Sequence, residues 1–179
     1  MKTVTIVGLG LIGGSFALAL KKVGLADTII GVDADLQHCR EALELGIVDT
    51  LGDLKESVLV SDLVVLAIPI NAIQATLPKI LDYIPKDTIV MDMGSTKAGI
   101  GAIVRTHPNR KNYVATHPIA GTENSGPKAA FPELFMNKVS IICDPEESAL
   151  SAVKKVRTEV AGAKAVNGMA GFLELVGND

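Results

Sequence analysis

The chain has 179 residues, of which 48% are hydrophobic, so its length and composition predict one globular domain with a substantial core rather than a disordered chain. The formal net charge of −3 excludes the clustered basic surface that a nucleic-acid-binding protein needs. The apolar run at residues 4–20 is interrupted by glycines, is short for a membrane span and is followed by Lys21 and Lys22 rather than by a signal-peptide cleavage site. We therefore expect a cytoplasmic protein that binds neither nucleic acid nor membranes.

The two cysteines, Cys39 and Cys143, give no indication of metal chemistry. They lack the spacing of metal ligands, and two thiols in a chain of this size are typical of a reduced, cytosolic protein. We expect both to be buried and unreactive, and we expect no metal site.

Short β-branched runs alternate with amphipathic segments along the chain, which predicts a mainly parallel sheet with helices on both faces. The expected strands are residues 3–7, 28–32, 63–67, 88–91, 113–116 and 139–143. The expected helices are residues 12–23, 35–45, 70–81, 97–105 and 146–160. Gly24 and Gly46 end the first two helices, and Asp35 is the expected N-cap of the second.

The end of the chain departs from this alternation. Residues 163–166 are expected to form a last strand, which would complete a dinucleotide-binding domain of residues 1–166. Residues 167–179 form a short apolar segment that is expected to pack on another element, with residues 168–176 helical.

A glycine-rich turn joins the first expected strand directly to the first expected helix. In this context Gly8 allows the tight turn, Gly10 lets the backbone approach a pyrophosphate, and Gly13 permits close packing of the helix on the strand. Leu11 and Ile12 lie at the helix N-terminus, which presents free N–H groups and a partial positive charge to phosphates. The turn predicts a dinucleotide site.

Asp33 ends the second expected strand, where a carboxylate can accept hydrogen bonds from ribose hydroxyls. It would repel the 2′-phosphate of NADP, and no arginine follows at residues 34–36, so NAD is the expected cofactor. The alternative is that the glycines only shape a turn and Asp33 caps a helix. Pro69 follows the third expected strand, where it either turns the chain beneath the nicotinamide or simply begins a helix.

Two polar side chains follow neighbouring expected strands, Ser95 after the fourth and His117 at the end of the fifth. Because parallel strands end at the same edge of a sheet, both would lie beside the cofactor, where a hydrogen bond between them is reasonable. Spacing alone favours Ser95 as a helix N-cap. An imidazole fixed beside a nicotinamide is typical of dehydrogenases that act on alcohols. We interpret His38 and His107 as solvated.

Three segments together resemble the prephenate and arogenate dehydrogenases of tyrosine biosynthesis: GLGLIGGS at residues 8–15, DMGSTK at residues 92–97 and THPIAGTENSG at residues 116–126. The resemblance extends to about residue 166, and its HPIAGTE block is its most specific part. It implies a doubly wound α/β fold of Rossmann type and the NAD-dependent oxidative decarboxylation of prephenate to 4-hydroxyphenylpyruvate.

The resemblance also implies roles for individual residues. His117 would hydrogen-bond the ring hydroxyl of the substrate and take its proton, and Ser95 would support both groups. Thr122 and Glu123 would lie at the substrate pocket, with Glu123 helping to order or gate it. Family members continue into an all-helical domain that forms a homodimer and supplies an arginine for a substrate carboxylate. Nothing after residue 166 matches that domain, so residues 167–179 are expected to be a remnant of it.

Three other interpretations remain open. The substrate could be arogenate, because the residue that distinguishes the amino group of arogenate from the keto group of prephenate is expected in the helical domain. Another dehydrogenase with the same glycine turn, acting on hydroxy acids or imines, would not need the HPIAGTE block. A non-catalytic NAD-binding fragment would bind the cofactor without turnover.

Overall fold

The computed structural model describes residues 1–157 and 172–175. Its strands are β1 (Thr3–Val7), β2 (Thr28–Val32), β3 (Thr50–Leu51), β4 (Leu63–Leu66), β5 (Ile89–Asp92), β6 (Tyr113–Pro118), β7 (Ser140–Cys143) and β8 (Phe172–Leu175). Its α-helices are α1 (Leu11–Lys22), α2 (Leu36–Glu44), α3 (Leu54–Leu59), α4 (Ile70–Tyr83), α5 (Ala98–Val104) and α6 (Leu150–Lys155). Short 3₁₀ helices are η1 (Arg110–Asn112), η2 (Pro127–Ala129) and η3 (Pro145–Glu147).

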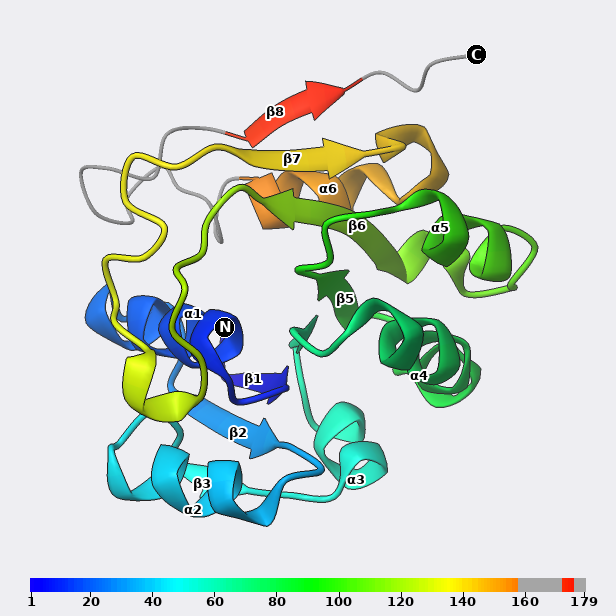
Figure 1. The fold of residues 1–179 in the computed structure, drawn as a ribbon. Helices are drawn as coiled ribbons and strands as arrows, with labels where there is room; N and C mark the ends of the chain where they lie inside the picture. Colours follow the sequence, from blue (N-terminus) through cyan, green and yellow to red (C-terminus); the bar gives the residue numbers. More distant parts are fainter. Residues whose placement is uncertain (158–171, 176–179) are drawn as a thin grey trace.

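Within the described residues the strands form one sheet in the order β3-β2-β1-β4-β5-β6-β7-β8 (Figure 1). The first six strands are parallel, whereas β7 runs antiparallel to β6 and β8 runs parallel to β7. The expectation of a mainly parallel, doubly wound sheet of Rossmann type is confirmed. The strand order reverses between β1 and β4, which is the position where such sheets bind their ligands.

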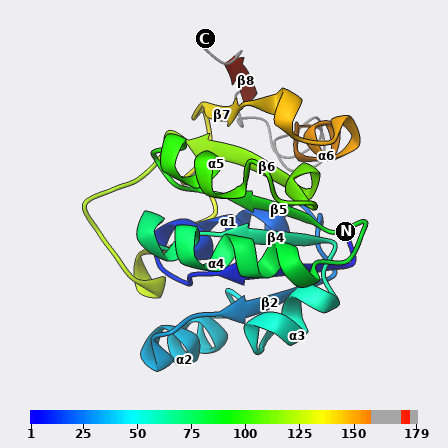
Figure 2. The same ribbon diagram turned by 90° about the vertical axis from the view of Figure 1, so that its right-hand side faces the viewer.

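Helices cover both faces of the sheet (Figure 2). Phe16 of α1 and Val153 of α6 belong to the core on one face, while Leu77 of α4 and Ile100 of α5 belong to the core on the other. All four residues of β4 are fully buried, with alternate side chains in the two cores. The continuous apolar run of this strand therefore follows from burial on both faces.

The expected strands and helices all occur through residue 143, with ends that differ by one or two residues, but two short elements were not predicted. They are β3 and α3, of two and six residues. Asp53 caps α3 by accepting hydrogen bonds from the backbone N–H groups of Lys55 and Glu56. This cap was visible in the sequence, but an element so short shows too little hydrophobic periodicity to be recognised.

The helix expected over residues 146–160 is wrong at its start, because η3 precedes an α6 that begins only at Leu150. Ser148 lies between them in an extended conformation, buried, and its hydroxyl donates to the carbonyl oxygen of Tyr113 at 2.7 Å. The strand expected at residues 163–166 lies outside the described residues. Within the expected helical remnant, Phe172–Leu175 form the strand β8 instead, because the free edge of β7 offers backbone partners.

Cys39 and Cys143 are free thiols, as expected, but both are half-buried rather than buried. Burial raises the pKa of each thiol above its ordinary value, so both are protonated at neutral pH. No cluster of histidine, cysteine and acidic residues within residues 1–157 and 172–175 has the arrangement of a metal site. None of the described helices has the length and apolarity that crossing a membrane requires.

Candidate nucleotide and catalytic site

The glycine turn lies where the strand order reverses, and two of its glycines are required by packing. Gly8 has a φ of +97°, and a β-carbon there would lie 2.6 Å from the carbonyl oxygen of Ala67, which follows β4. A β-carbon on Gly13 would overlap the Gly8 carbonyl oxygen and press on Ile6. A β-carbon on Gly10, in contrast, would meet no atom within 4 Å. The turn is therefore tight on its protein side and open on its solvent side.

Helix α1 begins at Leu11, with Gly10 in the N-cap position and Ile12 in its first turn. No side chain caps this end, and no acidic residue lies in the first turn. The first turn of α1 thus supplies no carboxylate of its own to neutralise its N–H groups and the positive end of the helix dipole. This arrangement suits a phosphate group, as the sequence predicts.

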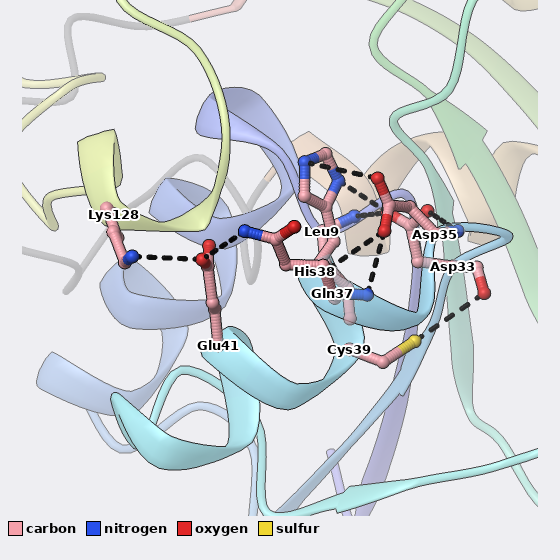
Figure 3. A network of polar contacts seen from close by, with 8 residues as sticks. All are labelled: Leu9, Asp33, Asp35, Gln37, His38, Cys39, Glu41 and Lys128. Atoms are coloured by element: carbon pink, nitrogen blue, oxygen red, sulfur yellow. Dashed lines mark hydrogen bonds and ion pairs between the residues drawn. The ribbon is translucent and has the colours of Figure 1, made fainter.

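Asp33 is held rigidly against the glycine turn (Figure 3). Its Oδ2 accepts a hydrogen bond of 2.7 Å from the backbone N–H of Leu9, and its Oδ1 accepts one of 2.9 Å from that of Asp35. Only 13% of its side chain is exposed. The N-cap of α2 is Asp35, whose Oδ1 accepts from the N–H of Gln37 at 2.7 Å. The alternative that Asp33 caps this helix is therefore wrong.

Pro69 is exposed and occupies the N-cap position of α4, immediately before the helix. It lies one residue beyond the loop atoms that approach Gly8, since Ile68 also comes within 2.9 Å of a β-carbon built there. Its place at the start of a helix agrees with the interpretation that Pro69 simply begins a helix. A position at the carboxyl end of β4 keeps it beside the cofactor edge of the sheet.

Ser95 is exposed and is not a helix cap, so that prediction is wrong. Helix α5 begins at Ala98 with Lys97 in the N-cap position, and no side chain caps it. The reason is Asp92, whose Oδ2 accepts hydrogen bonds from the Gly94 N–H at 3.0 Å and from the Lys97 ammonium. These contacts hold residues 93–97 as a loop. Among the described residues no hydrogen bond involves the Ser95 hydroxyl, and the residue is exposed.

His117 lies in β6 opposite Ile141 of β7, near the carboxyl end of the strand and half-buried. Burial lowers the pKa of its imidazole, the positive charge of Lys97 lowers it further, and Asp92 opposes both. Within the described part of the chain no hydrogen bond joins Ser95 to His117, although both residues lie at the same edge of the sheet. A neutral imidazole at neutral pH follows from these surroundings.

The other two histidines differ from the prediction. His107 is only 15% exposed, and its Nε2 lies 3.1 Å from Asp82 Oδ1 while its Nδ1 accepts from the Asn109 N–H at 3.1 Å. The expectation that His107 is solvated is therefore wrong, because it joins the loop after α5 to α4. His38 is 34% exposed and lies 3.6 Å from Asp33, between that acid and Asp35.

The connection between β6 and β7 carries Thr122 and Glu123, and both are exposed. The Thr122 hydroxyl oxygen accepts a hydrogen bond of 3.2 Å from the Asn124 N–H, which shapes a local turn. Glu123 lines an open, mainly polar hollow on the surface. The other residues at this hollow are Asn124, Ser125, Lys128 and Ala129.

This connection crosses from β6 to helices α1 and α2, as Figure 1 shows. The Phe131 N–H donates to the buried Ser15 hydroxyl at 3.0 Å. Lys128 pairs with Glu41 at 3.0 Å (Figure 3). The segment with Thr122 and Glu123 is therefore anchored beside the nucleotide site at one end and beside His117 at the other. Sequence reasoning missed these anchors, because Ser15 and Phe131 are far apart in the sequence.

Fold and site together define a doubly wound nucleotide-binding domain whose ligand groups gather at the carboxyl edge of the strands. Residues 16–168 match the family described as "Prephenate dehydrogenase, nucleotide-binding domain", and the chain belongs to this family. The resemblance read from the three sequence segments is thus confirmed.

Two curated relatives illustrate the similarity. The prephenate dehydrogenase of Bacillus subtilis is 32% identical over 166 residues, which are 91% of this chain and 45% of the relative. The cyclohexadienyl dehydrogenase of Zymomonas mobilis is 32% identical over 155 residues, which are 85% of this chain and 52% of the relative. The chain therefore spans about half the length of these proteins.

Solved structures agree. The prephenate dehydrogenase of Aquifex aeolicus superposes with a TM-score of 0.84 at 27% identity, over 98% of this chain and 62% of that one. The arogenate dehydrogenase of Synechocystis superposes with a TM-score of 0.75 at 27% identity, over 97% and 59% of the two chains.

Proposed function

We propose that this chain carries the NAD site and the catalytic base of an enzyme that oxidatively decarboxylates prephenate to 4-hydroxyphenylpyruvate in tyrosine biosynthesis. The observation that carries the proposal is the half-buried imidazole of His117 at the same sheet edge as the open glycine turn. A structure of the Aquifex aeolicus relative, with a TM-score of 0.81, holds hydroxyphenyl propionate and NAD⁺, which supports both parts of the proposal.

The chain's own residues fit NAD. The N–H groups at Leu11, Ile12 and Gly13 would face the pyrophosphate, and the open side of Gly10 would let it approach. Asp33, fixed by two backbone donors, would accept the ribose hydroxyls and repel a 2′-phosphate. The loop at Pro69 would lie beneath the nicotinamide. When bound, the cofactor would accept the hydride from the carbon that bears the substrate hydroxyl.

His117 would remove the proton that remains on that hydroxyl. As the hydride leaves, the oxygen becomes a carbonyl, its proton passes to the neutral imidazole, and the ring carboxylate departs as carbon dioxide. The electron pair of the broken carbon–carboxylate bond stays on the ring, which becomes aromatic with a phenolate oxygen, and this oxygen takes up a proton to give 4-hydroxyphenylpyruvate. Ser95, which is exposed, would support the imidazole and the substrate hydroxyl. A positioned base typically contributes roughly 10²–10⁴-fold to the rate.

Thr122 and Glu123 would contact the substrate from the β6–β7 connection, with Glu123 ordering the open hollow that it lines. The arginine for a substrate carboxylate is not identified in this chain. We propose that it belongs to a helical dimerisation domain and that the functional unit is a homodimer, with residues 1–166, together with the strand β8 that pairs with β7, forming the dinucleotide-binding domain.

Arogenate is the second candidate substrate. It is favoured by one specific observation, the similarity to the Synechocystis arogenate dehydrogenase over 97% of this chain. The two substrates differ only in the keto or amino group of the side chain. A non-catalytic NAD-binding role is the alternative outside enzymes.

The test has two stages. Isothermal titration calorimetry on the 179-residue chain should show binding of NAD and much weaker binding of NADP. NADH formation is then followed with prephenate and with arogenate, for this chain and for the complete polypeptide that contains it. We expect turnover by the complete polypeptide and little by the isolated chain, because a dicarboxylate substrate without its cation is poorly bound. If the chain does not bind NAD, the proposed cofactor site is contradicted. If the complete polypeptide turns over neither substrate, the proposed reaction is contradicted.

A further inference from the structure

We propose that Lys97 is a positioning residue whose ammonium group, fixed on Asp92, is held beside His117 and keeps that imidazole in the neutral form that accepts a proton. The inference rests on the proposed role of His117 as the base. It concerns a residue outside the predicted site, since the sequence analysis places Lys97 at the start of a helix and in the DMGSTK segment but gives it no role.

The first step is the geometry of Asp92, which is fully buried at the end of β5. Its Oδ1 accepts from the Tyr113 hydroxyl at 2.7 Å and from the Thr116 N–H at 3.3 Å, both in β6. Its Oδ2 accepts from the Gly94 N–H and from the Lys97 ammonium. One carboxylate thus ties the loop that carries Ser95 to the strand that carries His117.

The second step is the side of the sheet on which these groups lie. Tyr113 and Ala115 belong to the core covered by α4 and α5, whereas Val114 belongs to the opposite core. Because side chains alternate along a strand, His117 points to the same face as Tyr113. That face is covered by α5, whose N-cap is Lys97.

The third step is the burial of the ammonium group. The Lys97 side chain is 10% exposed, and a β-carbon on Gly94 would lie 3.3 Å from its Nζ, so the loop closes over it. Burial lowers the pKa of Lys97, and the charge and hydrogen bond of Asp92 oppose that effect. A buried charge is weakly screened by solvent and salt, so it acts on its neighbours at longer range than a surface lysine does.

The fourth step is the sign of the combined effect on His117. Besides burial, the lysine lowers the imidazole pKa and Asp92 raises it, and the lysine has the larger influence. The Tyr113 phenol and the Cys143 thiol near this cluster are uncharged at neutral pH, because burial raises the pKa of each. The Arg110 guanidinium lies 5.0 Å from the centroid of the Tyr113 ring, but it is not among the groups that influence the pKa of His117. The negative charge of Asp92 is already balanced by the hydrogen-bond donors around its carboxylate, so the Lys97 ammonium has the larger effect on the pKa of His117.

The consequence for catalysis is a base that stays available as the pH falls. A protonated imidazole cannot accept the hydroxyl proton, so every increase in its pKa reduces the active fraction below neutrality. After turnover, the imidazolium beside Lys97 would release its proton to solvent readily. No hydrogen bond joins Lys97 to His117 within the described residues, so the lysine acts on the imidazole through its charge.

The test is an NMR titration of the His117 ring in this chain, which needs no substrate and so separates this inference from the proposed function. Lys97→Met should raise the His117 pKa, and Lys97→Arg should keep it near the wild-type value. The matched control is Lys79→Met, which removes the same charge from an exposed position on α4. Unchanged or lower His117 pKa in Lys97→Met would overturn the inference.

A freed Asp92 carboxylate could raise the His117 pKa by itself, so a double variant is needed. Asp92→Asn/Lys97→Met removes both charges, and the His117 pKa should still exceed the wild-type value because the lysine has the larger influence. A value at or below wild type would assign the effect to Asp92 and overturn the role of Lys97. In the complete polypeptide, the acid limb of kcat against pH should move to higher pH in Lys97→Met and should be restored by Lys97→Arg. If Lys97→Met fails to fold, the double variant, which leaves no unpaired buried carboxylate, still decides the question.

Discussion

The carboxylate of Asp33 accepts a hydrogen bond of 2.7 Å from the backbone N–H of Leu9. The acid at the end of β2 is thereby fixed to the glycine turn after β1, so the group that would read the ribose cannot move independently of the turn that would hold the phosphates. A long flexible side chain in its place would lose this coupling.

Replacing Asp33 should change cofactor choice. Asp33→Ala removes the ribose acceptor and the repulsion of a 2′-phosphate, so the affinity for NAD should fall and that for NADP should rise relative to it. Calorimetry with both cofactors measures the ratio. Asp35→Ala is the control, because it removes the cap of α2 at a cost of about 0.5–2 kcal/mol in stability and leaves the NAD-to-NADP ratio unchanged. Equal ratios in Asp33→Ala and wild type would contradict the assignment.

Two glycines of the same turn should respond in opposite ways. Gly13→Ala forces a β-carbon onto the Gly8 carbonyl oxygen, so overpacking should lower the free energy of unfolding by about 1–3 kcal/mol or more. Gly10→Ala meets no protein atom and should unfold at nearly the wild-type denaturant concentration, but it should lose NAD affinity. Urea titration and calorimetry on both variants separate the two effects. Normal NAD binding by a folded Gly10→Ala would argue against a pyrophosphate at this turn.

The anchor of the β6–β7 connection should depend on Ser15. Ser15→Ala leaves the Phe131 N–H without its acceptor, which should cost about 1–3 kcal/mol in stability and speed hydrogen exchange at the Phe131 amide. The exposed Ser125, in the same connection, provides the control. Unaltered exchange at Phe131 in Ser15→Ala would mean that this contact does not hold the connection.

Acid should weaken the fold partly through Asp49. Burial raises the pKa of this carboxylate, but hydrogen bonds from Lys21 and from the Ile29 N–H outweigh burial, and the net pKa is lowered. A lowered folded-state pKa stabilises the protein above the unfolded-state value of about 3.9, and the benefit is lost as the pH falls through the folded-state pKa. In urea titrations, the stability gap between wild type and Asp49→Asn should therefore be larger at pH 7 than at pH 3. A gap that does not change with pH would contradict this.

The sequence predicted the parts of the site that depend on residues close together along the chain or at the end of one strand. The strand–turn–helix at Gly8 and the acid at Asp33 could be predicted, because a tight turn and the end of a neighbouring strand restrict which residues fit. The helix cap expected at Ser95 was wrong, because the surroundings of this residue depend on Asp92 and Lys97, whose pairing no periodicity reveals. The contact of Ser15 with Phe131 joins residues 116 positions apart and could be known only from the fold.

The most direct test of the account is His117→Asn in the complete polypeptide, with kcat for NADH formation from prephenate and NAD affinity measured side by side. Asparagine keeps a polar side chain but cannot accept the hydroxyl proton at neutral pH. We predict that kcat falls by roughly 10²–10⁴-fold while NAD affinity is nearly unchanged, and that His107→Asn leaves kcat near wild type. A His117→Asn enzyme with the wild-type kcat and the same acid limb would show that another group is the base.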